Sequence, residues 1–124
     1  MTRPTPATKP ALRGRLWVEF SGKPALTEAT ADLLEQIEAT GSLSEAGRRL
    51  RFSYRRAWML LDAANKRWPR PVAVTATGGQ RGGGTKLTPL GVAVLHSYRD
   101  LQLQLEHLLD TATATFVAAA QQGG

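Results

Sequence analysis

The chain has 124 residues, of which 42% are hydrophobic and 21% are charged, and its formal net charge is +6. This size and composition predict one globular domain with short terminal extensions and exclude a chain that is disordered throughout. It has no cysteine, which excludes disulfides, cysteine-ligated zinc or iron–sulfur centres and thiolate nucleophiles.

The N-terminal residues 1–10, MTRPTPATKP, contain three prolines and no apolar core. They are expected to form a disordered arm and not a secretory signal. No segment approaches the roughly 18–20 apolar residues that a membrane-spanning helix needs. Together these features predict a cytoplasmic protein.

Basic and acidic residues are segregated along the sequence. Ten basic residues lie from Arg48 to Lys86 with one acidic residue, Asp62, among them, whereas residues 28–45 contain acidic but no basic side chains. Such segregation favours a surface for a polyanion. A basic face that is merely solvated is the alternative, and the position of the charges within a motif decides between the two.

A short strand and a helix are expected first. Residues 12–20, LRGRLWVEF, predict the strand because they are rich in aromatic and β-branched side chains, and residues 21–24 predict a turn. The helix is expected from an N-cap at Thr27 to about Thr40, where Gly41 provides a left-handed stop. Its apolar stripe consists of Ala29, Leu33, Leu34 and Ile37.

The next two helices are expected to form a helix-turn-helix. An S-x-x-E capping box at residues 42–45 starts a short second helix. After a turn at residues 51–52, Ser53 is expected to cap a third helix, which ends before Pro69.

The third helix has two distinct faces. A helix that enters the major groove needs an apolar side that anchors it and a side with long side chains that reach the bases. The expected anchoring residues are Ala57, Leu60, Leu61, Ala64 and Trp68. The opposite side carries Arg55, Met59, Asp62 and Lys66, with Arg56 at its edge. Asp62 is expected to pair with Lys66 four residues later, and a hydrogen bond to cytosine is the alternative.

A glycine-rich hairpin follows. Residues 72–77 and 85–87 predict two strands, joined by GGQRGGG at residues 78–84. Such a hairpin can act as a wing, because glycine lets the backbone come close to a phosphate chain or a minor groove. A nucleotide site is not expected, since the segment has neither a Walker pattern nor a dinucleotide fingerprint.

Thr88 and Pro89 predict the start of a long helix that continues to about Asp110. Its apolar positions are spaced 4,3,4,3, which is typical of a coiled-coil seam and predicts a homodimer. An intramolecular core is the alternative. The seam consists of Val94, Tyr98, Leu101, Leu105 and Leu108.

Two segments resemble a known family. LLEQIEATGSLSEAGRRLRFSYRRAWMLLDAANKRW and TATGGQRGGGTKLTPLG resemble the N-terminal DNA-binding domain of the ModE family of molybdate-responsive regulators, over about residues 12–110. The diagnostic parts are G-S-[LI]-S, S-Y-R-R-A-W and T-G-G-x-x-G-G-G-x-x-L-T. The resemblance implies a LysR-like winged helix-turn-helix that binds, as a dimer, a palindromic operator near genes for molybdenum uptake or molybdoenzymes. The family's molybdate-binding modules carry an S-A-R-N segment that these residues lack, so molybdate binding and other cofactors are not expected.

The expected fold is mainly α with a small β-hairpin, a winged helix-turn-helix followed by a long C-terminal dimerisation helix. Its expected parts are a disordered arm at 1–10, the DNA-binding domain at 11–88, the dimerisation helix at 89–110 and a tail at 111–124.

Contacts to DNA are expected from the start of the third helix and from the wing. The base-reading group is predicted to be Ser53, Tyr54, Arg55 and Arg56, although Tyr54 could belong to the core. An arginine there can bind guanine O6 and N7, which discriminates by about 1–3 kcal/mol. Trp58 is expected in the core. Phosphate contacts are predicted for Ser44, Lys66, Thr77, Gln80, Arg81 and Lys86.

Two other functions are considered. The alternative is a protein-interaction adaptor or antirepressor that heterodimerises with a full-length regulator through the long helix. An enzyme is not expected, because the sequence shows no histidine–carboxylate or nucleophile arrangement. His96 and His107 would be about 16 Å apart on one helix, too far to share a metal, and are expected at the surface.

Overall fold

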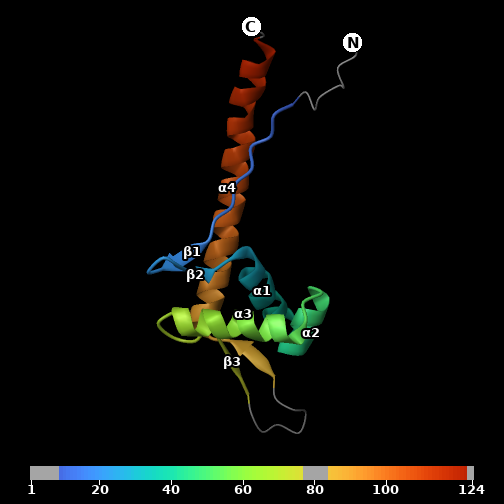
Figure 1. Cartoon of the computed structure of the whole chain (residues 1–124), viewed down its shortest axis with the longest axis vertical. Helices are drawn as coiled ribbons and strands as arrows, with labels where there is room; N and C mark the ends of the chain where they lie inside the picture. Colours follow the sequence, from blue (N-terminus) through green and yellow to red (C-terminus); the bar gives the residue numbers. More distant parts are fainter. Residues whose placement is uncertain (1–8, 77–83, 123–124) are drawn as a thin grey trace. The chain divides into compact units, whose positions relative to one another are not determined.

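The computed structural model describes residues 9–76 and 84–122 and shows a mainly helical winged helix-turn-helix with two small hairpins and a long C-terminal helix (Figure 1). This confirms the predicted fold class. No helix among the described residues is long and apolar enough to cross a membrane. The elements are β1 (Val18–Phe20), β2 (Lys23–Leu26), α1 (Glu28–Thr40), α2 (Leu43–Arg49), α3 (Tyr54–Arg67), β3 (Ala73–Thr75), β4 (Thr85–Leu87) and α4 (Pro89–Gln121).

The chain divides into two compact units. One comprises Leu16–Arg99, and the other comprises Met1–Arg15 together with Asp100–Gly124. In the second unit the described part of the N-terminal segment runs beside α4 as far as Arg15 (Figure 1). There the Leu12 N–H donates to Thr113 Oγ1 over 3.4 Å.

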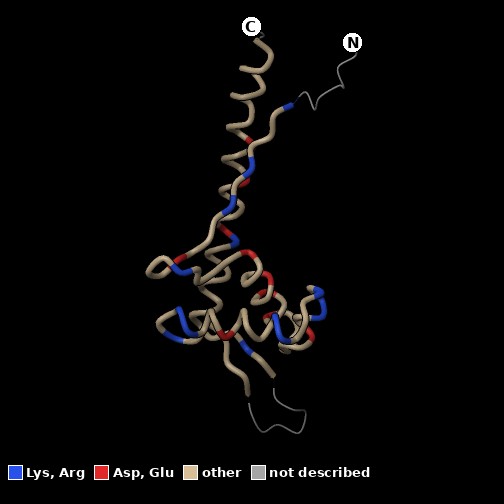
Figure 2. The backbone as a smooth tube through the Cα atoms, viewed as in Figure 1, with Lys and Arg blue, Asp and Glu red and all other residues tan. Residues whose placement is uncertain are grey.

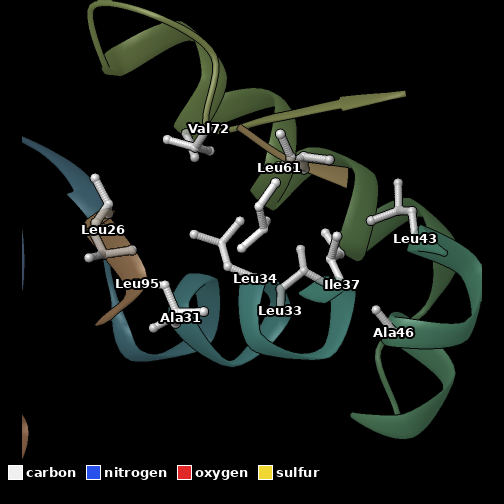
Figure 3. Packing of buried hydrophobic residues seen from close by; sticks show 14 of the residues in the cluster. Leu26, Ala31, Leu33, Leu34, Ile37, Leu43, Ala46, Leu61, Val72 and Leu95 are labelled. Carbon is white, nitrogen blue, oxygen red and sulfur yellow. The ribbon is translucent and has the colours of Figure 1, made fainter. Parts of the chain in front are cut away.

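The core of the unit 16–99 is centred on α1. Leu33, Leu34 and Ile37 are almost completely removed from solvent, and each such side chain contributes about 1.5–3 kcal/mol of transfer free energy. Figure 3 shows them facing side chains from other parts of the unit. These neighbours include Leu26 of β2, Ala46 of α2, Leu61 of α3, Leu95 of α4 and Val72 just before β3.

The predicted ends of α1 are confirmed. Thr27 is the N-cap, and its Oγ1 accepts from the Thr30 N–H over 3.3 Å. Gly41 is the left-handed C-cap, with φ of 72°, a conformation that costs glycine little.

The capping box of α2 is only half as predicted. Ser42 Oγ accepts from the Glu45 N–H over 3.1 Å. The return bond is absent, because the Ser42 N–H donates to Thr40 Oγ1 and the Glu45 carboxylate pairs with Arg48 at 2.8 Å. Thr40 thus takes the place of Glu45 as the acceptor for the Ser42 N–H, and Arg48 takes the place of that N–H as the partner of Glu45.

The turn between α2 and α3 depends on small residues. Phe52 N–H donates to the Gly47 carbonyl over 2.9 Å, and Arg51 adopts a positive φ of 60°. A Cβ at Gly47 would lie 3.1 Å from Ala57 Cβ. The two helices can therefore approach closely only with a small residue on each side.

The first hairpin corrects the prediction for residues 12–24. The strand β1 is shorter than expected. Lys23 and Pro24, which were predicted to belong to a turn, are part of a second strand, β2. The turn is Ser21–Gly22, both with positive φ. The β1 pairing stops at Val18 opposite Leu26, because α1 begins two residues later and leaves no partner. Pro24 is tolerated because both strands are edges.

The second hairpin, between β3 and β4, is confirmed at its strands. Ala73 pairs with Leu87 and Thr75 with Thr85 in antiparallel register. The Asn65 side chain secures the hairpin's start: its Oδ1 accepts from the Val72 N–H at 2.8 Å and its Nδ2 donates to the Ala73 carbonyl at 3.1 Å. The glycine-rich segment lies mostly outside the described residues.

The predicted start of α4 is confirmed, but its predicted end is wrong. Thr88 Oγ1 accepts from the Gly91 N–H over 3.0 Å, and Pro89 is the first helical residue. The helix ends at Gln121 and not near Asp110. Residues 111–121, TATATFVAAAQ, contain neither proline nor glycine and are rich in alanine, the best helix former.

Candidate nucleic-acid interface

The first turn of α3 presents the predicted base-reading group to solvent. Ser53 Oγ caps the helix by accepting from the Arg56 N–H over 3.0 Å. Tyr54 is 60% exposed and not part of the core, and Arg55 and Arg56 are exposed beside it. Four consecutive side chains that can donate hydrogen bonds therefore lie at one helix end.

Arg56 is oriented by an aromatic ring. Its guanidinium carbon lies 4.1 Å from the centre of the Phe52 ring, within the range of a cation–π interaction. Among the residues that the structure describes, none forms a hydrogen bond or an ion pair with the Arg55 side chain. One arginine is thus pre-oriented while its neighbour is free to reach a ligand.

The opposite side of α3 anchors it in the core as predicted. Ala57, Leu61 and Ala64 are buried, and the half-buried Leu60 and Trp68 pack against the same cluster. The exposed face carries Arg55, Met59 and Lys66. The helix therefore has the two-sided form that entry into a groove requires.

Trp58 corrects the prediction that it belongs to the core. Its side chain is 50% exposed. At about 100° per residue, Trp58 lies a quarter turn from Ala57, and only the narrow stripe centred on Ala57 is covered. Met59, a further step around the helix, is 53% exposed.

The predicted pair between Asp62 and Lys66 is confirmed, with 2.8 Å between the carboxylate and Lys66 Nζ. The Lys66 side chain is 75% exposed, so the ion pair is screened by solvent and stabilises the fold little. The structure therefore shows the expected ion pair within α3, between Asp62 and Lys66.

The predicted phosphate contacts are only partly within the described residues. Ser44 is exposed in the first turn of α2, and Lys86 is exposed on β4 opposite Val74. Thr77, Gln80 and Arg81 lie outside the described residues.

Acidic side chains of α1 are engaged by α4. Arg99 pairs with Asp32 at 2.7 Å and with Glu35 at 2.8 Å. Burial alone would lower the pKa of Arg99, but the hydrogen bonds that its guanidinium donates to these two carboxylates outweigh burial and raise the pKa. Figure 2 shows acidic positions along α1 and basic positions on α2 and α3. The basic side of the unit is thus separated from its acidic side.

The two histidines are exposed, as predicted, and His96 Nε2 lies 3.1 Å from a Glu38 carboxylate oxygen. Among the residues that the structure describes, no group of three or more histidine, cysteine or acidic side chains could hold a metal ion.

The predicted seam of α4 has a buried part and an exposed part. Val94 and Tyr98 are buried in the core of the unit 16–99, where the Tyr98 hydroxyl donates to the Leu16 carbonyl over 2.8 Å. Burial raises the pKa of Tyr98. Leu101 and Leu108 are 48% and 61% exposed, and Leu105 is half-buried. Only these last three positions are available to another chain.

Comparison with known proteins connects this architecture to one group of regulators. The chain is 38% identical over 86 residues, 69% of its length, to the molybdenum transport protein ModE of Azotobacter vinelandii, of which 32% is covered. It is 41% identical over 75 residues to the transcriptional regulator ModE of Haemophilus influenzae, and 34% identical over 74 residues to the DNA-binding transcriptional dual regulator ModE of Escherichia coli K12. Each of these two matches covers 60% of this chain, and 29% and 28% of the respective relative.

The chain is homologous to the N-terminal part of ModE regulators. It spans about three-tenths of the length of these curated relatives. No protein-family model matches it. These relatives are named as transcriptional regulators and as a molybdenum transport protein, which agrees with the expectation that the chain is not an enzyme.

Two residues of this ModE homologue were missed by sequence reasoning. Phe52 was assigned to a turn, yet it supports Arg56, and its position four residues before an arginine is the signal that could have identified it. Asn65 was not singled out, yet it fixes the β3–β4 hairpin to α3. A lone asparagine in a helix carries no sequence signal for such a long-range contact.

Proposed function

We propose that this ModE homologue is a transcriptional regulator that binds double-stranded DNA in a sequence-specific manner. The observation that carries the proposal is the geometry of α3: its first turn exposes Ser53–Arg56 while Ala57, Leu61 and Ala64 fix the helix in the core. An arginine projecting from a rigid helix can read guanine in the major groove. The relatives named as transcriptional regulators support the same function.

The proposal assigns two kinds of contact. Arg55 and Arg56 read base edges, with Ser53 and Tyr54 beside them. Phosphate contacts fix register and orientation without reading sequence, and they are assigned to Ser44, Lys66, Thr77, Gln80, Arg81 and Lys86.

We further propose that the chain binds a palindromic operator as a homodimer. Two recognition helices related by a two-fold axis meet successive major grooves about 34 Å apart. The exposed Leu101 and Leu108, together with the half-buried Leu105, form the proposed dimer seam on α4. An apolar row on a helix is the usual means of such pairing.

A link to molybdenum genes is the last part of the proposal. It rests on the names of the relatives, which include a molybdenum transport protein and transcriptional regulators ModE. Because the 124 residues contain no S-A-R-N segment, we expect binding by this chain to be unchanged when molybdate is added.

The decisive experiment selects duplexes from a random library with the purified chain and measures their affinity by fluorescence anisotropy. Wild type is expected to enrich a palindrome. The double variant Arg55→Ala/Arg56→Ala should retain the fold by circular dichroism but lose at least tenfold in preference for that palindrome over a scrambled duplex.

A matched control removes two positive charges elsewhere. Arg15→Ala/Lys23→Ala changes two exposed cations outside α2 and α3 and should keep the preference. If the α3 double variant still selected the wild-type site, the assignment of the recognition helix would be wrong. If wild type bound a full-length ModE protein in pull-down but no duplex, the adaptor function would replace this proposal.

A further inference from the structure

A methionine lies at the centre of the exposed face of α3. At about 100° per residue, Met59 is displaced by about 200° from Ala57 and lies about 20° from Lys66 and about 40° from Arg55 around the helix. Ala57 is completely buried, whereas Met59 is 53% exposed. Met59 is thus the apolar residue that points most directly away from the core of its own chain.

Packing within the chain does not account for this position. Met59 is absent from the buried cluster and from the partly buried residues that pack on it. The apolar residue next to it in sequence, Leu60, turns toward the core instead. An unbranched thioether chain is therefore held in solvent on the face that is proposed to meet DNA.

The neighbours of Met59 on this face are charged, and some of them already pair with each other. Arg55, one turn earlier, projects beside it on the same face. Asp62 and Lys66, on the following turns, pair with each other at 2.8 Å. Along α3, this face therefore presents first the guanidinium of Arg55, then the apolar side chain of Met59, and then the Asp62–Lys66 ion pair.

We propose that Met59 determines specificity by contacting the 5-methyl group of a thymine in the operator. The inference rests on the proposed function and names a further feature that the same helix reads. In the major groove the thymine methyl is the apolar feature of the base edges, and it is recognised by apolar contact. A methionine side chain is flexible enough to adapt its shape to such a group.

Helix geometry places this thymine close to the base read by Arg55. Four residues correspond to about 6 Å along the helix, and neighbouring base pairs are about 3.4 Å apart. The contacted thymine is therefore expected within about two base pairs of the arginine contact. A 5-methylcytosine carries the same methyl group, and the experiment separates these two sources.

The test uses the duplex selected by the wild-type chain. Each thymine of the half-site is replaced singly by deoxyuridine, which removes only the methyl group. Wild type is expected to lose about fourfold in affinity at one position, the value for one buried methyl-sized group. In Met59→Gln, which keeps length but adds polarity, this sensitivity should vanish, and in Met59→Leu it should be retained.

Val92→Ala is the matched control, since Val92 is another exposed apolar residue, 38% exposed on α4. It should keep the wild-type sensitivity to deoxyuridine. At the sensitive position, duplexes with cytosine and 5-methylcytosine are compared with the thymine duplex. Tighter binding to the 5-methylcytosine duplex would overturn the assignment to thymine.

The outcomes distinguish this inference from the proposed function. If wild type selects a duplex but no deoxyuridine substitution weakens binding, or if Met59→Gln keeps the sensitivity, the role of Met59 is wrong while the DNA-binding function stands. If wild type selects no duplex at all, the proposed function fails and the inference fails with it.

Discussion

Tyr98 links the chemistry of one side chain to the stability of the unit 16–99. Its ring is buried in the core, and its hydroxyl donates to the Leu16 carbonyl just ahead of β1. Burial raises the pKa of the phenol above its ordinary value of 10.0. The folded state therefore keeps its proton at a pH where the unfolded chain has already lost it.

This pKa shift predicts a loss of stability in alkali. Above about pH 10 the unfolded chain binds fewer protons at this site than the folded chain does, so the free energy of unfolding falls as pH rises. Tyr98→Phe should cost about 1 kcal/mol at pH 8, where it removes only the hydrogen bond. Urea denaturation at pH 8, 9.5 and 11 should show this difference between the two proteins narrowing.

Tyr54→Phe is the control, because this tyrosine is exposed and its replacement should leave the pH dependence unchanged. A gap between wild type and Tyr98→Phe that stays constant over the whole range would contradict the assigned role of burial.

At the scale of elements, the junction between the wing and α4 depends on one close contact. A Cβ at Gly91 would lie 1.9 Å from the Val72 carbonyl oxygen. Thr88 reinforces the junction, because its hydroxyl donates to the Pro71 carbonyl over 2.7 Å and its N–H donates to the Val72 carbonyl over 3.0 Å. The first turn of α4 is therefore held against the chain that leads into β3.

Gly91→Ala is expected to destabilise the protein although alanine is the better helix former. The added methyl group cannot be accommodated without moving backbone, and such overpacking costs about 1–3 kcal/mol. Urea denaturation measures the change, with Val92→Ala, an exposed neighbour, as the control. A Gly91→Ala midpoint equal to or above that of wild type would show that α4 can move away from Val72.

Local chemistry made most of these elements predictable. The residues that start or end the helices interact with the backbone within one helical turn, so the sequence specifies the helix ends directly. They are Thr27, Gly41, Ser53 and Pro89. The strand β2 could not be found in this way, because Lys23 and Pro24 become extended only by pairing with β1. The end of α4 was missed because its weakly patterned, alanine-rich turns carry no amphipathic signal.

The part of the candidate interface that lies on the exposed face of α3 could be predicted from the sequence. Arg55 and Arg56 were identified correctly as exposed residues because the apolar side of α3 has a clear period. Trp58 was misplaced because a large aromatic residue favours burial on average, while only tertiary contacts decide how wide the covered stripe is. The partner of Arg56, the Phe52 ring, depends on the conformation of the turn and was missed for the same reason.

For the whole molecule, the segregation of charge predicts how binding responds to salt. Three acidic residues of α1, Asp32, Glu35 and Glu38, face α4, where they lie beside Arg99 and His96. The proposed phosphate contacts come instead from α2, α3 and the β3–β4 hairpin. A dimer doubles these contacts, and each one releases a counterion, which makes affinity fall steeply as salt rises. The salt dependence of the affinity for a palindromic duplex therefore depends both on the number of phosphate contacts per chain and on whether the chain binds as a dimer.

The proposed dimer can be tested on the exposed part of the seam. Leu101→Ser/Leu108→Ser should shift the chain from dimer to monomer in sedimentation equilibrium, because both side chains are exposed in the single chain and their burial would be lost. The variant should also bind a palindrome at least tenfold more weakly, with a salt dependence about half as steep, while binding to an isolated half-site is retained. Leu103→Ser is the matched control, since Leu103 is 65% exposed but lies off the seam. A wild-type chain that sediments as a monomer, or a double variant that stays dimeric, would show that the seam on α4 does not join two copies.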